Sequence, residues 1–256
     1  MIEINDIVKS FDGSTVLNHI SASLEDGKVN MIIGQSGSGK TVLLKSVIGL
    51  HIPDEGDILY DGRSLTAMKE KDLRLLRREM GMLFQGSALF DSLSVIENVK
   101  FPMQVFSDKD EEEMEQRARY CLQRVNIPEH VFHLMPGEIS GGQQKRVAIA
   151  RAIVLEPKYL FCDEPNSGLD PRTSLVIDQL IKELTEELGT CTVVNSHDMN
   201  SIMEIGDNIL FLKNGVKEWQ GSRQDIFHSD NEALDDFVFA SNLYKEVKRT
   251  HLLHQQ

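Results

Sequence analysis

The sequence has no long apolar run, few cysteines and few aromatic residues. Its longest apolar stretches, such as residues 147–155 with Arg151 in their midst, fall well short of the ~20 residues that a transmembrane helix needs. The three cysteines, Cys121, Cys162 and Cys191, are odd in number and unevenly spaced, which indicates neither a disulfide framework nor a metal knuckle. We therefore expect reduced core thiols and a chain that does not cross a bilayer by itself.

Basic residues are also fewer than acidic ones. Lysine and arginine number 27 against 40 aspartates and glutamates, so the formal net charge is −13. A nucleic-acid-binding domain normally carries a net basic surface, and adhesion to anionic lipid needs basic clusters. The composition thus predicts that the chain binds no nucleic acid. The acidic, strand-like start at residues 1–4 does not resemble a secretory signal, so we expect a cytoplasmic protein.

The sequence does contain the alternating strand and helix patterns of an α/β domain. A chain of 256 residues, 41% apolar and 26% charged, suits one domain with a small inserted lobe. Short alternating runs over residues 2–24 predict an antiparallel β lobe, and a helical pattern over about residues 86–142 predicts an inserted helical lobe. A parallel α/β core is predicted by alternating apolar strands and helices, at residues 29–33, 41–49, 80–84, 143–155, 159–162, 171–188 and 192–195. Within the lobe we expect helices at residues 95–101 and 110–125.

Residues 34–41, GQSGSGKT, match the phosphate-binding pattern G-x-x-x-x-G-K-[ST] between a predicted strand and a predicted helix. The glycines free the backbone to turn its N–H groups toward phosphates, and the helix adds its positive dipole end. Lys40 is expected to reach the β and γ phosphates of ATP, and Thr41 to give a hydroxyl to Mg²⁺. The nucleotide-binding residues predicted here are Gly34, Gln35, Ser36, Gly37, Ser38, Gly39, Lys40, Thr41 and Val42.

An acidic pair ends a buried strand at Asp163 and Glu164. The carboxyl edge of the sheet is where doubly wound folds bind ligands. Because neighbouring residues on a strand point to opposite sides, one carboxylate can serve Mg²⁺ while the other faces the attacking water. We assign Asp163 to the metal and Glu164 to the general base.

The four segments at residues 34–41, 139–143 (ISGGQ), 163–164 and His197 together resemble the ATP-binding subunit of an ABC transporter, over about residues 2–221. The resemblance implies a Mg²⁺-dependent ATPase. Its fold would be a P-loop NTPase of ABC type, with a RecA-like parallel-sheet core beside the two lobes. Residues 1–221 would form the cassette, with the helical lobe at about 86–142, and residues 222–256 a C-terminal helical extension and tail.

ISGGQ resembles the LSGGQ signature, which in that family binds the γ-phosphate of ATP held by the other subunit. Serine and two glycines ahead of a helix suit this role, because a helix N-terminus attracts phosphate. The resemblance therefore implies a homodimer that sandwiches two ATP molecules. The nucleotide-binding residues expected from it are Ser140, Gly141, Gly142 and Gln143.

Further positions resemble the family one by one. Gln85 resembles the Q-loop glutamine, which contacts Mg²⁺ or water and relays the nucleotide state to the membrane partner. His197 resembles the switch histidine that bonds the γ-phosphate, and residues 167–170 (SGLD) resemble the D-loop at the dimer seam. Phe11 resembles the aromatic residue that stacks on adenine, with phenylalanine where tyrosine is commoner.

Residues 84–102, FQGSALFDSLSVIENVKFP, are similar to a subgroup, the ATPases of Mla-type, MCE-associated transporters that move phospholipid between bacterial membranes. This similarity implies an integral-membrane permease, an MCE-domain protein and a small regulatory subunit as partners. It places the chain peripherally on the cytoplasmic face of the inner membrane. The apolar residues of the run suit either a groove for the permease's coupling helix or the core of the lobe, and both interpretations stay open.

Two other functions would use the same catalytic residues: a membrane-associated regulatory ABC ATPase of the cell-division type, which moves no cargo, and the ATPase of another small-solute ABC importer. A chromosome- or repair-type ATPase would need a long heptad insertion. Only 54 residues separate Gln85 from Ser140, and this sets that class aside.

Overall fold

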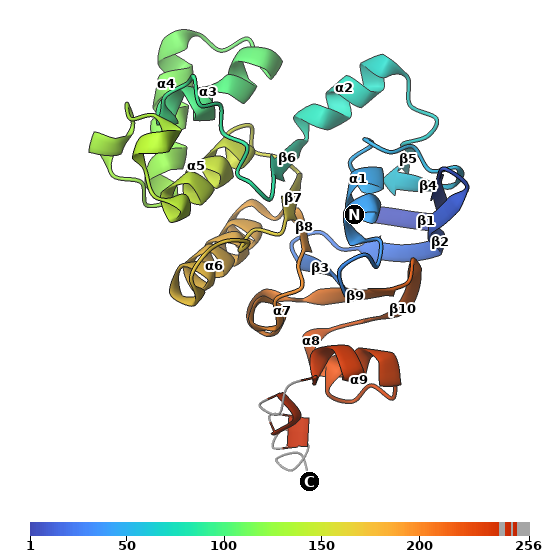
Figure 1. Cartoon of the computed structure of the whole chain (residues 1–256). Helices are drawn as coiled ribbons and strands as arrows, with labels where there is room; N and C mark the ends of the chain where they lie inside the picture. The colour runs from blue at the N-terminus through green and yellow to red at the C-terminus, as the bar shows by residue number, and fades with distance from the viewer. Residues whose placement is uncertain (241–243, 247, 250–256) are drawn as a thin grey trace. The chain divides into compact units, whose positions relative to one another are not determined.

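The computed structural model describes residues 1–240, 244–246 and 248–249 (Figure 1). The chain divides into two compact units, one formed by Met1–Met68 with Asn195–Gln256 and the other by Lys69–Val194. The predicted tail lies partly outside the described residues, and the predicted boundary after residue 221 stays a prediction. None of the helices in the described part of the chain is both long and apolar enough to span a bilayer.

The first unit contains an antiparallel sheet with the strand order β2-β1-β4-β5. Its strands are β1 (Ile2–Phe11), β2 (Ser14–Leu24), β4 (Glu55–Tyr60) and β5 (Arg63–Ser64). Ile2 and Ile4 of β1 are buried, and they pair with Leu24 and Ala22 of β2. Alternate residues on one face of β1 therefore form the core of the lobe, as the period-two pattern predicted.

The first unit also holds the strand that leads into the phosphate-binding pattern. β3 (Val29–Ile33) is buried at every residue and pairs in parallel with β9 (Asn208–Lys213), which pairs in antiparallel with β10 (Val216–Gly221). The strand order here is β10-β9-β3. The helices of this unit are α1 (Lys40–Val47), α7 (Met199–Ile205), α8 (Arg223–Ile226) and α9 (Glu232–Val238).

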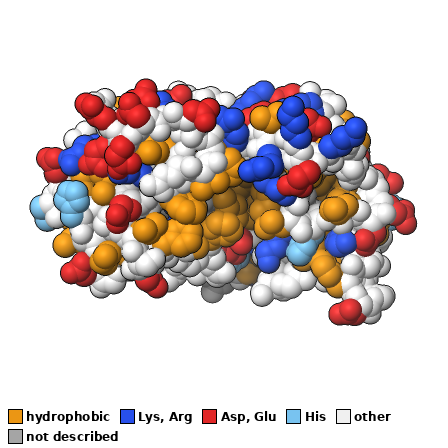
Figure 2. Space-filling view, turned by 90° about the horizontal axis from the view of Figure 1, so that it is seen from above, with side chains coloured by type: hydrophobic (Ala, Val, Ile, Leu, Met, Phe, Trp, Pro, Cys, Tyr) orange, Lys and Arg blue, Asp and Glu red, His pale blue; other side chains and the backbone are white. Residues whose placement is uncertain are grey.

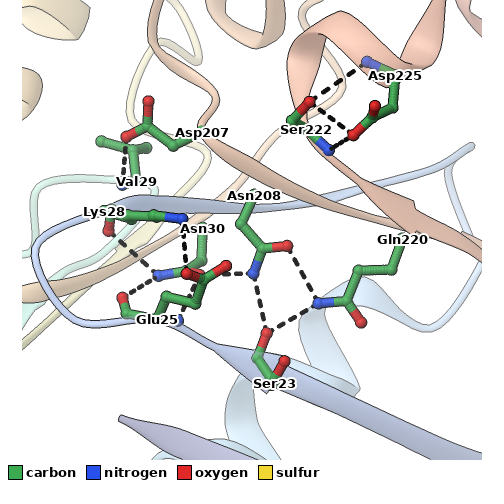
Figure 3. A network of polar contacts seen from close by, with 10 residues as sticks. All are labelled: Ser23, Glu25, Lys28, Val29, Asn30, Asp207, Asn208, Gln220, Ser222 and Asp225. Atoms are coloured by element: carbon green, nitrogen blue, oxygen red, sulfur yellow. Dashed lines mark hydrogen bonds and ion pairs between the residues drawn. The ribbon is translucent and has the colours of Figure 1, made fainter.

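A buried amide network aligns the start of β3 with β9 (Figure 3). Asn30 is fully buried, and its Oδ1 accepts hydrogen bonds from the Glu25 amide at 2.8 Å and from Asn208 Nδ2 at 2.8 Å. Asn208 Oδ1 accepts from Gln220 Nε2 at 3.1 Å. Because an unpaired buried amide would be costly, this chain of partners favours the register in which Asn30 lies opposite Asn208.

The second unit combines parallel strands with the helical lobe. Its strands, in the order β8-β7-β6, are β6 (Met80–Leu83), β7 (Tyr159–Asp163) and β8 (Cys191–Asn195), and β6 pairs in parallel with β7. Helices α2 (Glu70–Arg78) and α6 (Pro171–Leu188) belong to this unit. Parallel and antiparallel sheets with intervening helices confirm the predicted α/β fold class.

The helical lobe consists of α3 (Val95–Phe106), α4 (Glu111–Arg124), two short 3₁₀ helices at Glu129–Val131 and Pro136–Glu138, and α5 (Gly141–Ile153). All three α-helices begin with a capping box, at Ser94, Asp110 and Ser140. Such a box satisfies N–H groups that the first turn leaves without partners.

Several helix boundaries differ from the prediction by one to five residues, and those of α3 and α5 have a clear cause. α3 continues five residues past Phe101, because Pro102 sits inside it and the fully buried Met103 keeps the next turn in the core. α5 starts at Gly141, two residues before the predicted start, because Ser140 rather than a later residue caps it.

Candidate functional site

Two glycines of the loop between β3 and α1 are required by the local geometry. Gly34 has φ of 149°, and a Cβ there would lie 2.2 Å from the Leu212 carbonyl oxygen. Gly39 has φ of 102° and is the N-cap of α1, where a Cβ would lie 3.0 Å from Leu17 Cδ2 and 3.1 Å from the Val16 carbonyl oxygen. Any side chain at these two positions would clash, so the tight loop depends on glycine.

Lys40 extends across this loop. It is buried, and its Nζ donates to the carbonyl oxygens of Gly34 at 2.8 Å and Gln35 at 3.1 Å. Ser38 Oγ is also buried and has no hydrogen-bond partner among the described residues. A buried cation, a buried hydroxyl and the start of a helix suit the phosphates of a nucleotide.

Thr41 lies one residue further on and is exposed. Its hydroxyl oxygen accepts a long hydrogen bond from Asn195 Nδ2, at 3.4 Å. The exposed hydroxyl is of the type that holds Mg²⁺ beside bound phosphates. Asn195, the last residue of β8, was not among the predicted site residues, since a buried amide at a strand end carries no sequence signature of its own.

Phe11 and His197 are the other predicted site residues of the first unit. Phe11 is 38% exposed, and its ring packs edge-on against His51, with centroids 5.2 Å apart. Lys9 Nζ lies 5.4 Å from the centre of the same ring. His197 is exposed and follows Ser196, whose amide donates to the Ile32 carbonyl at 3.2 Å. His51 was not among the predicted site residues, because a lone histidine in a turn gives no signal.

The acidic pair of the second unit adopts a different backbone from the one predicted. Asp163 is the last residue of β7, whereas Glu164 lies beyond the strand with φ of 46°. Alternation along a strand therefore does not orient Glu164. A left-handed conformation at a glutamate is uncommon and often marks a functional position. Both residues are half-buried.

Gln85 follows β6, and its side chain is exposed. Its Nε2 donates to Ser167 Oγ at 3.3 Å, so the structure brings the predicted Q-loop and D-loop residues together. Its backbone carbonyl accepts a hydrogen bond from Lys145 Nζ at 2.6 Å. Beside Ser167, Asn166 Nδ2 donates to the buried Asp178 at 2.8 Å. Lys145 and Asp178 were not predicted as site residues.

The ISGGQ segment forms the start of α5. Ser140 Oγ accepts from the Gln143 amide at 3.3 Å, and Gln143 Oε1 accepts from the Ser140 amide at 3.0 Å. Ser140 and Gly141 are exposed, and a Cβ at Gly141 would meet no atom within 4 Å. Among the residues that the structure describes, none demands glycine at position 141, and the backbone there is open to close approach.

An apolar groove of about 430 Å³ lies in the second unit. Phe84, Phe90 and Phe101 are 42%, 42% and 36% exposed, and the rings of Phe90 and Phe101 have centroids 4.7 Å apart. Figure 2 shows hydrophobic side chains gathered in a hollow beside lysines and arginines. Such exposure favours the groove over the core interpretation of these three phenylalanines.

Comparison with known proteins gives one matching family model and many relatives. The model described as "ABC transporter" matches residues 17–167. A methionine import ATP-binding protein, MetN, of Clostridium tetani is 40% identical over 227 residues, which are 89% of this chain and 71% of the relative. A phosphonates import ATP-binding protein, PhnC, of Lactobacillus gasseri is 37% identical over 94% of both chains. A probable ribonucleotide transport ATP-binding protein, mkl, of Mycobacterium leprae is 36% identical over 93% of this chain and 68% of the relative.

Solved structures show the same fold. The dimeric post-hydrolysis state of the ATP-binding cassette MJ0796, bound to ADP and Pi, matches with a TM-score of 0.80 and 32% identity over 87% of this chain and 99% of that one. The cbiO1 protein of Clostridium perfringens matches with a TM-score of 0.82 and 32% identity over 90% and 91%.

Proposed function

Since the chain belongs to the ABC transporter family, as a subunit that binds and hydrolyses ATP with Mg²⁺, we propose that it drives a separate permease that moves phospholipid between bacterial membranes. Family membership supports ATP hydrolysis. The phospholipid cargo is our proposal, because the names of the relatives include methionine, phosphonate and ribonucleotide transport.

The loop of residues 34–42 holds the phosphates in this proposal. Buried Lys40 balances the charge of the β and γ phosphates, and the unpartnered hydroxyl of Ser38 gains an acceptor. Thr41, Asp163 and Gln85 would hold Mg²⁺, either directly or through water. The ion neutralises charge on the outer phosphates when it is bound. Phe11 offers its exposed ring to adenine.

Glu164 is the general base toward the attacking water, and His197 bonds the γ-phosphate. The left-handed backbone at Glu164 supports this role, because a strained residue at a strand end is retained where function requires its direction. A base placed in this way accelerates hydrolysis about a hundred- to ten-thousand-fold.

The chain works as a dimer in this proposal, and the first turn of α5 contacts the nucleotide of the other copy. Ser140, Gly141, Gly142 and Gln143 form the contact. Gly141 supports it, because no described residue lies within 4 Å of where a Cβ would be, which leaves the backbone open to close approach by a phosphate. The dimeric structure of the similar cassette MJ0796 supports the arrangement.

The apolar groove receives the permease. One of its exposed phenylalanines, Phe84, directly precedes Gln85, so the docked segment would adjoin a residue that contacts the nucleotide. The run of residues 84–102 that forms much of it is the part of the sequence that resembles Mla-type ATPases, and this supports phospholipid as cargo. An MCE-domain protein and a small regulatory subunit complete the proposed assembly, with the chain on the cytoplasmic face of the inner membrane.

Glu164→Gln tests the catalytic assignment. The variant is expected to bind ATP normally, to lose hydrolysis about a hundred- to ten-thousand-fold, and to accumulate as an ATP-bound dimer. Glu186→Gln is the matched control, since Glu186 is exposed on α6 and forms no ion pair with a described residue. Near-normal turnover in Glu164→Gln would remove Glu164 from the role of base.

Affinity purification of Glu164→Gln from detergent-solubilised native membranes, with ATP present, tests the cargo. Recovery of a permease with an MCE-domain protein and enriched phospholipid is the expected result. A single membrane protein with division or signalling partners and no enriched lipid would instead establish the regulatory ABC ATPase. Recovery with a small-solute permease would establish the importer.

A further inference from the structure

Helix α5 carries two cations into the interior of the second unit. Lys145 is 3% exposed and Arg151 is 8% exposed. Neither forms an ion pair with a residue that the structure describes. Burial lowers the pKa of both side chains. A buried charge without hydrogen bonds is strongly unfavourable, so both side chains need hydrogen-bond acceptors in the interior.

All the acceptors are backbone carbonyl oxygens of one short segment. Lys145 Nζ donates to Gln85 O at 2.6 Å, while Arg151 donates through Nη2 to Ser87 O and through Nη1 to Ala88 O, both at 2.7 Å. The cations thus lie against residues 85–88, which connect the proposed catalytic glutamine to the groove.

The backbone that Arg151 holds is unfavourable in isolation. Ser87 and Ala88 have φ of 62° and 47°. Two successive left-handed residues that are not glycine are both strained. A planar guanidinium can donate to two acceptors at once in a fixed fork, and a lysine ammonium cannot reproduce that geometry. The fork therefore explains how this turn is stabilised.

The same guanidinium also reaches the groove, and the helix that carries it begins at the signature-like segment. The Arg151 guanidinium lies 5.9 Å from the centre of the Phe90 ring and lines the groove. At its other end, α5 starts beside the Ser140 cap. One helix of 13 residues, roughly 20 Å long, thus joins three places to which the proposed function assigns contacts.

We propose that Lys145 and Arg151 are positioning residues that fix the backbone of residues 85–88 to α5, so that Gln85, the helix start at Ser140 and the groove rim at Phe90 move as one body. This inference rests on the proposed function insofar as Gln85 is taken to act at the nucleotide. When the permease contacts Phe90, or the second nucleotide contacts Ser140, α5 moves and Gln85 moves with it.

Arg151→Lys in the full chain tests the proposal, because it keeps the charge and removes the fork. Two measurements apply: hydrogen exchange of the Ser87 and Phe90 amides, which bond Phe84 O and Asn98 Oδ1, and steady-state ATP hydrolysis. Exchange of both amides is expected to be at least about tenfold faster. The kcat is expected to fall about tenfold, with KM for ATP within about twofold, since the loop of residues 34–42 is unchanged.

Arg117→Lys is the matched control. Arg117 lies on α4 and also donates to two backbone carbonyls, those of Val154 at 3.0 Å and Ile153 at 3.3 Å, away from residues 85–88. It is expected to change neither measurement. Adding Ala88→Gly to Arg151→Lys is expected to restore much of the lost kcat, because glycine adopts the left-handed conformation without strain. A role in packing alone would not respond to that glycine.

The outcomes separate this inference from the proposed function. Unchanged exchange in Arg151→Lys, faster exchange with unchanged kcat, or effects equal to those of Arg117→Lys would each overturn the positioning role. If the unmodified chain hydrolysed no ATP, the proposed function would fail, and the exchange of the Ser87 and Phe90 amides in Arg151→Lys would still decide whether Arg151 holds the segment.

Discussion

Replacing Asn98 with leucine would remove the side chain that organises the loop ahead of α3. Asn98 is fully buried, and its amide forms four hydrogen bonds. Oδ1 accepts from the Phe90 amide at 2.8 Å, and Nδ2 donates to the carbonyl oxygens of Phe90, Leu93 and Ser94 at 3.1, 3.0 and 3.0 Å. Leucine fills a similar space and can form none of these bonds.

The expected loss of folding stability depends on which backbone groups bonded to Asn98 have a second hydrogen-bond partner. The Phe90 carbonyl also accepts from the Leu93 amide, and the Ser94 carbonyl from the Asn98 amide. The Phe90 amide and the Leu93 carbonyl have no second partner among the described residues. Both hydrogen bonds are part-buried, so each lost partner costs about 1 kcal/mol, the lower end of the range for buried groups, and the free energy of unfolding should fall by about 2 kcal/mol.

Urea unfolding followed by circular dichroism measures the change, as a lower midpoint with an unchanged slope. Asn18→Leu is the control, because Asn18 is exposed and its side chain forms no hydrogen bond with a described residue. That control should stay within about 0.5 kcal/mol of the parent. A loss under about 1 kcal/mol in Asn98→Leu would refute the reasoning, since the loop would then not depend on this amide.

Three further predictions concern the dimer contact, the packing of β6 and the thiols. Ser140→Phe should leave ATP binding to the monomer intact and abolish hydrolysis that depends on the dimer; hydrolysis that is first order in monomer would contradict it. Gly81→Ala should destabilise the fold by about 1–3 kcal/mol, measured by thermal unfolding, because its Cβ would lie 2.3 Å from the Ala152 carbonyl oxygen; an unchanged midpoint would show that β6 and α5 separate without cost. Burial raises the pKa of Cys121 to about 11 and of Cys162 to about 12 from 9.0, so both thiols should react with Ellman's reagent only after unfolding. Because the folded pKa values are the higher ones, these thiols also reduce stability as the pH rises above about 9, and a native protein that titrates both cysteines at pH 8 would disprove their burial.

Features that depend on nearby residues were predicted well. The strand, loop and helix around Lys40 follow from an apolar run, three glycines and a helical pattern within twenty residues. The helix at Pro171–Leu188 was predicted with its bounds, because Asp170 caps it and Gly189 ends it. A cap and its first turn lie within a few residues of each other, so the sequence displays them directly.

Backbone conformation at single residues was predicted poorly. Glu164 was expected to point according to strand alternation, yet it lies outside the strand with φ of 46°. Neither Ser87 nor Ala88 is a glycine, so the sequence does not indicate the left-handed turn at these residues. Ordinary side chains hold such conformations only where distant contacts compensate the strain, and those contacts are not visible in a local pattern.

By itself the sequence determined the alternation of strands and helices, the phosphate-binding loop and the capped helix at Pro171–Leu188, because these depend on residues close together along the chain. Only the tertiary structure showed which hydrogen-bond acceptors Lys145 and Arg151 of α5 have. Lys145 and Gln85 are 60 positions apart, and Arg151 and Ser87 are 64. Their acceptors are backbone carbonyls, which every residue has, so only the packing of α5 beside the segment after β6 selects which ones receive the bond.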